Sequence, residues 1–252
     1  MVVLGAFAAT AVATLFAQAT GLRAWRGRRP YEAAWTVALT LFALASAAMS
    51  VGVTTGWDAP TFRLFYLFGA VLGVPWLALG TVHLLAPATQ ARRAQWAVVF
   101  LSGLATGVVL VAPMHTVPTG TAIPPGREVF GPAPRLCAAL GSSGATVVVV
   151  GGALWSAWRF ARRRAAPGAA RRALANLLIA AGTLLAGAAG LFQGRLGEDE
   201  AFVLALATGI TVLYLGFLVA TGPRARHTGV AGPPDRGMRA GWLSTGPAVP
   251  GG

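Results

Sequence analysis

Long apolar segments alternate with short polar ones from the N-terminus to about residue 221, and this alternation is the strongest pattern in the chain. The apolar segments lie at about residues 1–20, 33–53, 63–86, 96–112, 136–158, 173–192 and 201–221. Each has about the length that a helix needs to cross the hydrocarbon of a bilayer. The pattern predicts an all-α fold, a polytopic transmembrane bundle of seven helices formed by residues 1–221. Residues 222–252 are rich in proline and glycine, so we expect a disordered cytoplasmic tail.

Arginine is distributed unevenly over the segments between the predicted helices. Sixteen of the 20 arginines follow the first, third, fifth or seventh helix, whereas five of the seven carboxylates lie on the opposite side. The cytoplasmic loops of membrane proteins carry an excess of basic residues. We therefore expect an outside N-terminus, a cytoplasmic C-terminus and a multi-pass location in the inner membrane of a bacterium.

The composition supports a membrane protein and excludes several other classes. Hydrophobic residues make up 56% of the chain and charged residues only 11%, against about a quarter in soluble domains. The net charge is +13, but the arginines are clustered between apolar segments, so we expect them to bind anionic lipid headgroups rather than nucleic acid. The chain contains no lysine, which excludes a Schiff base, and its single cysteine, Cys137, excludes an intrachain disulfide.

The third predicted helix has the most informative pattern. Residues with small or polar side chains recur there at steps of three and four, which places them on one helical face: Tyr66, Gly69, Gly73, Trp76, Gly80 and His83. Such a face is expected to turn toward other helices, because lipid tails do not favour glycine or imidazole. Tyr66, Trp76 and His83 are therefore candidate ligand or partner contacts. Pro75, in the middle of this helix, predicts a kink and a candidate hinge.

The loop at residues 113–135 is long and contains six prolines. Connections of this length are usually functional lids or disordered. The hydrophobic residues Val129 and Phe130 within it favour an ordered cap across the outer end of the bundle. Arg127, Glu128 and Arg135 would then lie at the mouth of an outward cavity, as candidate ligand or partner contacts. The alternative is that these charges pair with each other.

Three further motifs each have a chemical interpretation and a structural one. Haem ligation by His83 needs a second histidine at the same depth, which neither His115 nor His227 offers. The sequence 141–144, Gly-Ser-Ser-Gly, matches the serine motif of rhomboid proteases, but no histidine base follows within the later helices, so a small-residue helix contact is favoured. His115 with the acidic run 198–200 has no metal-ligand spacing, and helix capping is favoured. We expect no cofactor and no metal.

Two stretches carry a resemblance to known proteins. At PWLALGTVHLL in the third predicted helix and at REVFGPAPRLCAALGSSGATVVVVGGALWSAWR around the fifth, the sequence resembles uncharacterised multi-spanning membrane proteins of high-GC actinobacteria. That group implies no activity. The layout also resembles the seven-helix sensor regions that precede bacterial histidine kinases, a topological likeness from which no site residue follows.

These observations predict a protein without enzymatic activity. The first interpretation is a scaffold or sensor that binds a lipid, a small apolar ligand or a partner protein through the cap and the third helix. The alternative is a small transporter or flippase-like carrier with Pro75 as its hinge, although no carboxylate lies inside an apolar segment, which disfavours ion coupling. The glycines of the third and fourth helices, Gly69, Gly73, Gly103 and Gly107, fit either a homodimer with another copy or the internal core.

Overall fold

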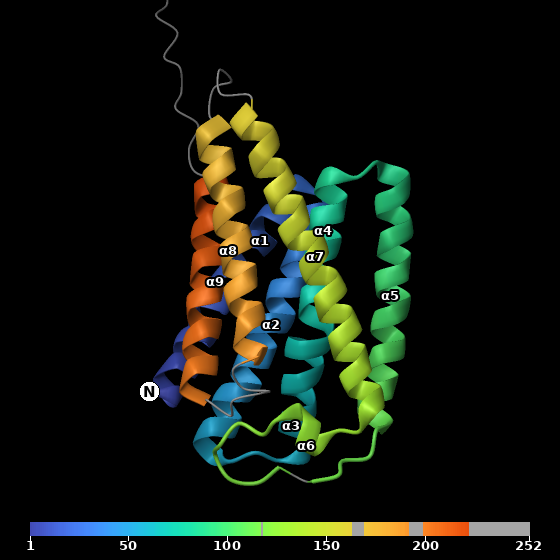
Figure 1. The fold of residues 1–252 in the computed structure, drawn as a ribbon, viewed down its shortest axis with the longest axis vertical. Helices are drawn as coiled ribbons and strands as arrows, with labels where there is room; N and C mark the ends of the chain where they lie inside the picture. Colours follow the sequence, from blue (N-terminus) through green and yellow to red (C-terminus); the bar gives the residue numbers. More distant parts are fainter. Residues whose placement is uncertain (117, 163–168, 192–198, 222–252) are drawn as a thin grey trace, which may run out of the picture. The chain divides into compact units, whose positions relative to one another are not determined.

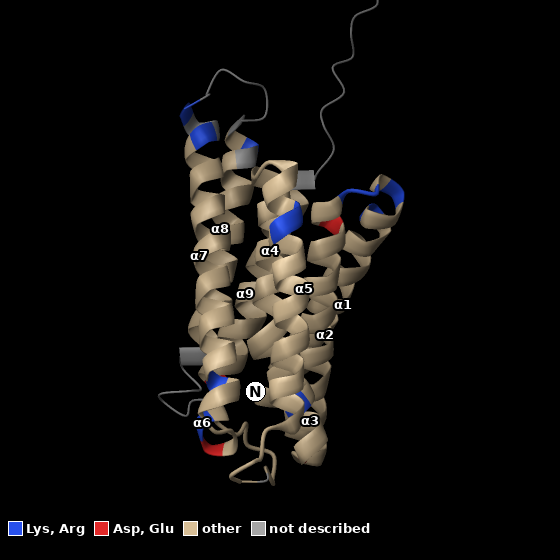
Figure 2. Ribbon diagram, turned by 90° about the vertical axis from the view of Figure 1, so that its right-hand side faces the viewer, with Lys and Arg blue, Asp and Glu red and all other residues tan. Residues whose placement is uncertain are grey.

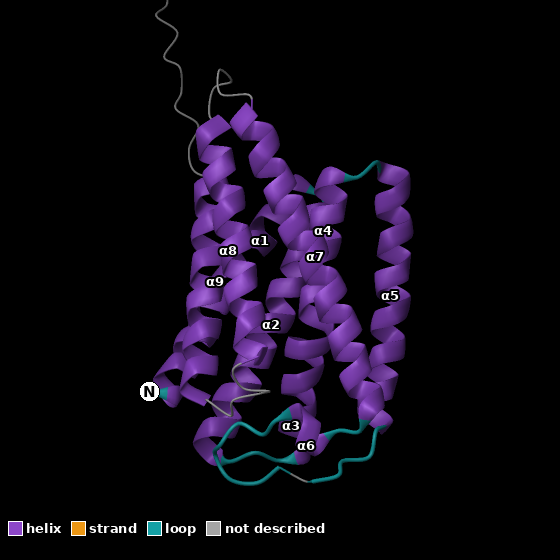
Figure 3. Cartoon of the chain, viewed as in Figure 1, coloured by secondary structure: helices purple, strands orange, loops and turns teal. Residues whose placement is uncertain are grey.

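A computed structural model describes residues 1–116, 118–162, 169–191 and 199–221. These residues form helices joined by loops, with one isolated antiparallel bridge between Met114 and Phe130 (Figure 3). The predicted tail, 222–252, lies outside the described residues. The all-α prediction is confirmed for the described part of the chain.

The helices follow the predicted apolar segments and extend beyond most of them. Their bounds are α1 Val2–Gly27, α2 Pro30–Thr55, α3 Ala59–Phe65, η1 Tyr66–Leu72, α4 Gly73–Leu85, α5 Ala88–Val111, α6 Gly126–Val129, α7 Pro132–Arg162, α8 Ala169–Leu191 and α9 Asp199–Thr221. The segment η1 is π-helical and joins α3 to α4 without a break in the chain of helical residues. We call the continuous helix Ala59–Leu85 the third spanning helix.

Six of these helices are long and apolar enough to cross a membrane: α1, α2, the third spanning helix, α5, α7 and α9. Within α8 the apolar stretch is shorter, Ala173–Ala189. The chain is thus a multi-pass membrane protein by the length and composition of its described helices. A seventh crossing, by α8, stays a prediction.

Successive long helices run in opposite directions (Figure 1). At one end α1, α4 and α7 finish while α2, α5 and α8 begin; we call it the Arg-rich end. Its described arginines are Arg23, Arg26, Arg28, Arg29, Arg92, Arg93, Arg159, Arg162 and Arg171. The opposite end, where α3 and α6 lie, is called the cap end. Figure 2 shows that charged residues occupy the two ends of the helices and leave their middle parts free of charge.

Local sequence explains several helix boundaries. Pro30 occupies the first turn of α2, where a missing amide hydrogen costs nothing. Helix α2 ends at Gly56, whose φ of 96° lies in the left-handed region that favours glycine. The side chain of Asp58 then accepts a hydrogen bond of 2.8 Å from the backbone N–H of Thr61 and so caps the start of α3.

Small residues set the closest helix packing, between α8 and α9. A Cβ atom on Gly182 would lie 2.6 Å from the backbone nitrogen of Leu213, and one on Gly209 would lie 2.6 Å from that of Ala186. Only glycine permits this approach, which is the usual way helices associate in membranes. In contrast, α5 lies at the edge of the bundle, packs on α4, η1 and α7, and is largely exposed.

Candidate functional site

The cap segment, residues 112–131 between α5 and α7, packs onto the cap end of the bundle. It buries Ile123, Val129 and Phe130 almost completely. The backbone N–H of Ile123 donates to Oδ2 of Asp199 at the start of α9 (2.9 Å), and the N–H of Trp57 donates to the carbonyl of Gly120 (2.8 Å). The segment is therefore fixed both to α9 and to the loop between α2 and α3. The hydrophobic residues within this loop had indicated such packing.

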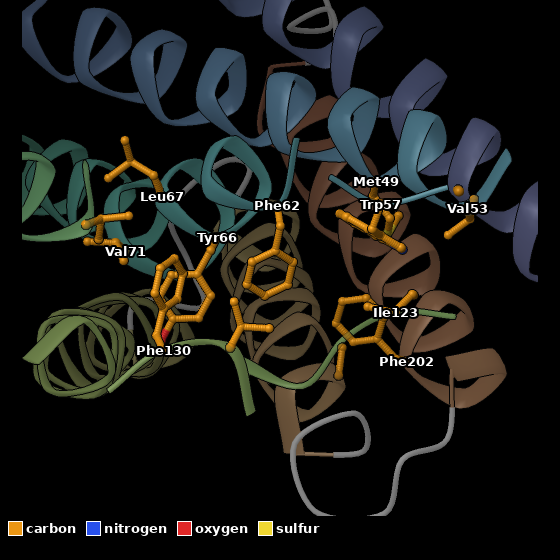
Figure 4. Close-up of a cluster of buried hydrophobic side chains, with 14 of the residues drawn as sticks. Met49, Val53, Trp57, Phe62, Tyr66, Leu67, Val71, Ile123, Phe130 and Phe202 are labelled. Atoms are coloured by element: carbon orange, nitrogen blue, oxygen red, sulfur yellow. The ribbon is translucent and has the colours of Figure 1, made fainter. Parts of the chain in front are cut away.

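An aromatic cluster connects the cap segment to the third spanning helix (Figure 4). The ring of Phe130 lies 5.0 Å from that of Tyr66 and 5.7 Å from that of Phe62, measured between centroids. Gly126 of α6 lies on the Tyr66 ring, because a Cβ atom at this glycine would be 2.6 Å from Cε2 of the tyrosine. Tyr66, a predicted contact residue, is thus buried beneath the cap segment.

Arg63 links the same cluster to α5. Its guanidinium donates to the carbonyl of Val109 and, at 2.8 Å, to that of Ala112, and it lies 5.6 Å from the centroid of the Phe130 ring. The last carbonyls of a helix have no partner within the helix and carry a partial negative charge. Arg63 therefore caps the end of α5. The sequence held no signal for this pairing across 46 residues.

The charged residues predicted at the mouth of a cavity are exposed. Nε of Arg127 lies 3.8 Å from Oε1 of Glu128, and both side chains are at least half exposed. An ion pair of this kind contributes little to stability. Arg135 lies exposed in the first turn of α7. None of the three lines either of the hollows described below, and the pair Arg127–Glu128 agrees with the alternative that these charges pair with each other.

A helical irregularity lies at the middle of the third spanning helix. Residues Tyr66–Leu72 form the π-helical turn η1, and the N–H of Gly73 donates to the carbonyl of Phe68, five residues earlier. Pro75 follows two residues later and has no amide hydrogen to continue either a π-helical or an α-helical pattern. A π-helical turn thus precedes Pro75, and the kink and hinge expected at this proline stay predictions.

Helix α7 packs on this irregularity with the 141–144 motif. The hydroxyl of Ser142 donates to the carbonyl of Ala70 at 2.6 Å. A Cβ atom on Gly141 would lie 3.5 Å from both the carbonyl oxygen of Val71 and Cγ of Pro75. Ser143 instead donates to a carbonyl of its own helix, that of Ala139. The motif acts as the helix contact that sequence reasoning favoured.

The π-helical turn also changes what the predicted face contacts. Gly69 and Gly80 lie against α2, where their Cβ positions would approach the side chains of Ala45 and Trp35. Nε1 of Trp76 donates to the hydroxyl of Ser102 on α5 at 3.2 Å. The single inward stripe expected from a constant 3.6-residue period is thus divided between the cap segment, α2 and α5. His83 lies half-buried in the last turn of α4, at the Arg-rich end.

The described residues form an open groove on α5 and a small hollow inside the bundle. One, of about 720 Å³, is an open apolar groove along α5 between Val99 and Val111, where Cβ atoms on Gly103 or Gly107 would have no neighbour within 4 Å. The other, of about 30 Å³, lies inside the bundle beside Trp35. The inner hollow has room for little more than a water molecule, whereas the groove lies open along the exposed face of α5.

The acidic residues at the cap end serve the structure of the cap. Asp199 accepts the hydrogen bond from Ile123, and Glu200 follows it in the first turn of α9. Glu198 lies outside the described residues. Within the described ranges no group of three His, Cys, Asp or Glu side chains is placed to hold a metal ion.

Comparison of the chain with protein-family models, with curated proteins and with solved structures finds no match in any of the three. The described residues join a cap segment, an aromatic cluster and a π-helical irregularity along one spanning helix.

Proposed function

We propose that this protein is a non-enzymatic membrane sensor or scaffold that binds a lipid or another small apolar ligand. The observation that supports this most is the division of the third spanning helix. Its first half, α3 and η1, packs against the cap segment through Phe62 and Tyr66 in addition to α2, α5 and α7, whereas its second half, α4, packs on these three helices. A molecule that contacts the cap segment thereby acts on a helix that crosses the whole bundle.

The proposed orientation places the cap segment outside and the Arg-rich end in the cytoplasm of a bacterial cell. Exposed tryptophans support a membrane boundary at the Arg-rich end: Trp25 is 87% exposed, Trp96 67% and Trp155 57%. Tryptophan is enriched where the bilayer meets water, and arginine on the cytoplasmic side. At the cap end Trp57 is buried inside the cluster instead. We therefore propose anionic lipid headgroups as partners of the Arg-rich end.

The proposed binding surface for the apolar ligand is the groove along α5. Its wall is apolar, and Cβ atoms on Gly103 and Gly107 would meet no neighbour within 4 Å. Because α5 is joined to the cap end through Arg63, occupation of the groove is connected to the cap segment by one side chain. A membrane protein partner is the other occupant that this surface would accept.

Native mass spectrometry of the protein, gently extracted from its own membranes, tests the proposal. A discrete bound mass supports it, and a bare monomer with only exchangeable lipid contradicts it. Gly107→Leu should fill the groove and lower the occupancy. Gly187→Leu is the matched control, because Gly187 also has open space around its Cβ position but lies on α8, away from the groove.

A second candidate function is that of a small transporter or flippase-like carrier. The irregularity before Pro75 favours it, since transporters use broken helices near the middle of the membrane. Solute uptake into vesicles that contain the Pro75→Ala variant tests this alternative. Unchanged uptake would count against Pro75 as a hinge for transport.

A further inference from the structure

Pro75 leaves one backbone carbonyl of the third spanning helix without its usual donor. An amide at position 75 would bond the carbonyl of Val71 in an α-helical register and that of Ala70 in a π-helical register. Proline supplies no hydrogen in either case. Inside a membrane no water replaces the lost bond, so a carbonyl there needs a donor from the protein.

Helix α7 supplies a donor to the carbonyl of Ala70, the one that a π-helical register would pair with position 75. Gly141 lets the backbone of Val71 and the ring of Pro75 come close, and the next residue, Ser142, donates its hydroxyl to the carbonyl of Ala70 at 2.6 Å. Within the described part of the chain, this is the side-chain hydrogen bond that reaches η1 from another helix.

The two halves of the third spanning helix share α2, α5 and α7 as neighbours but differ in the side-chain hydrogen bonds that hold them. On the α4 side, Nε1 of Trp35 donates to the carbonyl of Leu77 and Nε1 of Trp76 donates to Ser102, each at 3.2 Å. These bonds fix α4 to α2 and to α5. On the other side, α3 and η1 pack on the cap segment through aromatic rings. Loss of the Ser142 bond therefore removes a side-chain hydrogen bond from η1 and leaves the indole bonds of α4 in place.

From this arrangement we propose that Ser142 is a latch that holds the third spanning helix in its π-helical form and controls the position of the cap segment. A π-helical turn holds one residue more than an α-helical turn at the same place. Its conversion rotates the preceding α3 by about 100°, the angle between successive residues in a helix. That rotation carries Phe62 and Tyr66 away from Phe130. The latch is the regulatory element of the proposed sensor and depends on that proposal for its biological meaning.

Amide hydrogen exchange of the full chain in lipid nanodiscs, followed by mass spectrometry, tests the latch. Ser142→Ala should raise the exchange rates of η1 and of the cap segment by about three- to twenty-fold, the range expected for one interhelical hydrogen bond in a membrane protein. Ser143→Ala is the matched control, because Ser143 bonds its own helix and its loss should leave both rates unchanged. Equal rates in the two variants would overturn the latch.

Pro75→Ala gives a second test, and its first readout does not require the serine variant to fold. It restores an amide hydrogen, so exchange in η1 should slow, and Ser142→Ala should then have no further effect in this background. A full Ser142→Ala effect in the Pro75→Ala protein, or exchange in η1 that does not slow, would overturn the latch. These readouts do not depend on ligand, so failure of the latch and failure of ligand binding in native mass spectrometry are distinguishable.

Discussion

The contact between Gly126 and Tyr66 gives the strictest test of how the cap segment is held. In Gly126→Ala the added Cβ atom would lie 2.6 Å from Cε2 of the tyrosine, whereas ordinary contact begins at 3.4 Å. The φ of Gly126 is not positive, so alanine adopts this backbone conformation without strain. The substitution therefore acts through the contact alone.

The tyrosine ring has little room to move away from the new methyl group. Phe130 lies 5.0 Å from it and Phe62 lies 6.0 Å from it, between ring centroids. The cap segment must therefore shift outward by several tenths of an ångström. Overpacking of this kind costs about 1–3 kcal/mol. If that cost falls on closure of the cap segment, its open fraction rises by about fivefold to more than a hundredfold, since about 1.4 kcal/mol is a factor of ten.

Amide hydrogen exchange in residues 112–131 measures this change directly. Exchange should accelerate in Gly126→Ala and stay unchanged in Gly107→Ala, whose Cβ atom meets no neighbour within 4 Å. Removing the ring in Tyr66→Ala should make the Gly126→Ala substitution nearly neutral, because the two effects share one contact. Similar exchange in the Gly126 and Gly107 variants, or additive effects in the double variant, would refute the reasoning.

Three further predictions concern the fold around the site. Gly209→Ala should lower thermal stability in detergent, by about 1–3 kcal/mol, because the added Cβ meets the backbone of α8. Gly187→Ala on α8 should not, since its Cβ has open space. Equal melting temperatures of the two variants would contradict this prediction. Arg63→Lys should lower the free energy of unfolding by about 1–2 kcal/mol and speed amide exchange at the end of α5, because an ammonium does not reproduce the guanidinium fork that donates to two carbonyls. Exchange at the wild-type rate there would contradict the capping of α5 by Arg63. The hydrogen bonds from Thr61 lower the pKa of Asp58, so this carboxylate stabilises the fold at neutral pH. Its contribution is lost as the pH falls below about 4. The melting temperature, measured between pH 7 and 3, should therefore fall less in Asp58→Asn than in the wild-type protein.

The sequence predicted the elements that depend on hydropathy, and it underestimated their length. Helix α5 begins at Ala88 rather than near 96, and α7 runs from Pro132 to Arg162 rather than from 136 to 158. Hydropathy marks the part of a helix that lies in hydrocarbon, whereas the backbone pattern continues into the polar interface. The crossing of the membrane by α8 and the orientation of the termini stay predictions, because both depend on how the helices lie in a membrane.

The sequence did not predict the contacts that define the site. Pro75 and the motif at 141–144 were each noted, but their pairing through Ser142 and Ala70 joins residues 72 positions apart. A constant helical period across Tyr66–His83 also hid the π-helical turn, since nothing in local periodicity distinguishes a turn with one extra residue. A proline in one spanning helix and a Gly-Ser pair in another are the signals that would suggest such a pairing.

Helices in a membrane gain nothing from hydrophobic association, so small-residue packing and single hydrogen bonds decide which of them are held firmly. Backbone approach at Gly182 and Gly209 joins α8 to α9 along a continuous surface, which moves only as a unit. The third spanning helix also packs on α2 through Gly69 and Gly80, and in addition it has separate bonds with Trp35, Ser142 and, through Trp76, Ser102. Separate bonds can be exchanged one at a time. Movement within this bundle is therefore expected to concentrate in the third spanning helix, at η1. This segment lies between the part that contacts the cap segment and the part, α4, that the indole bonds of Trp35 and Trp76 fix.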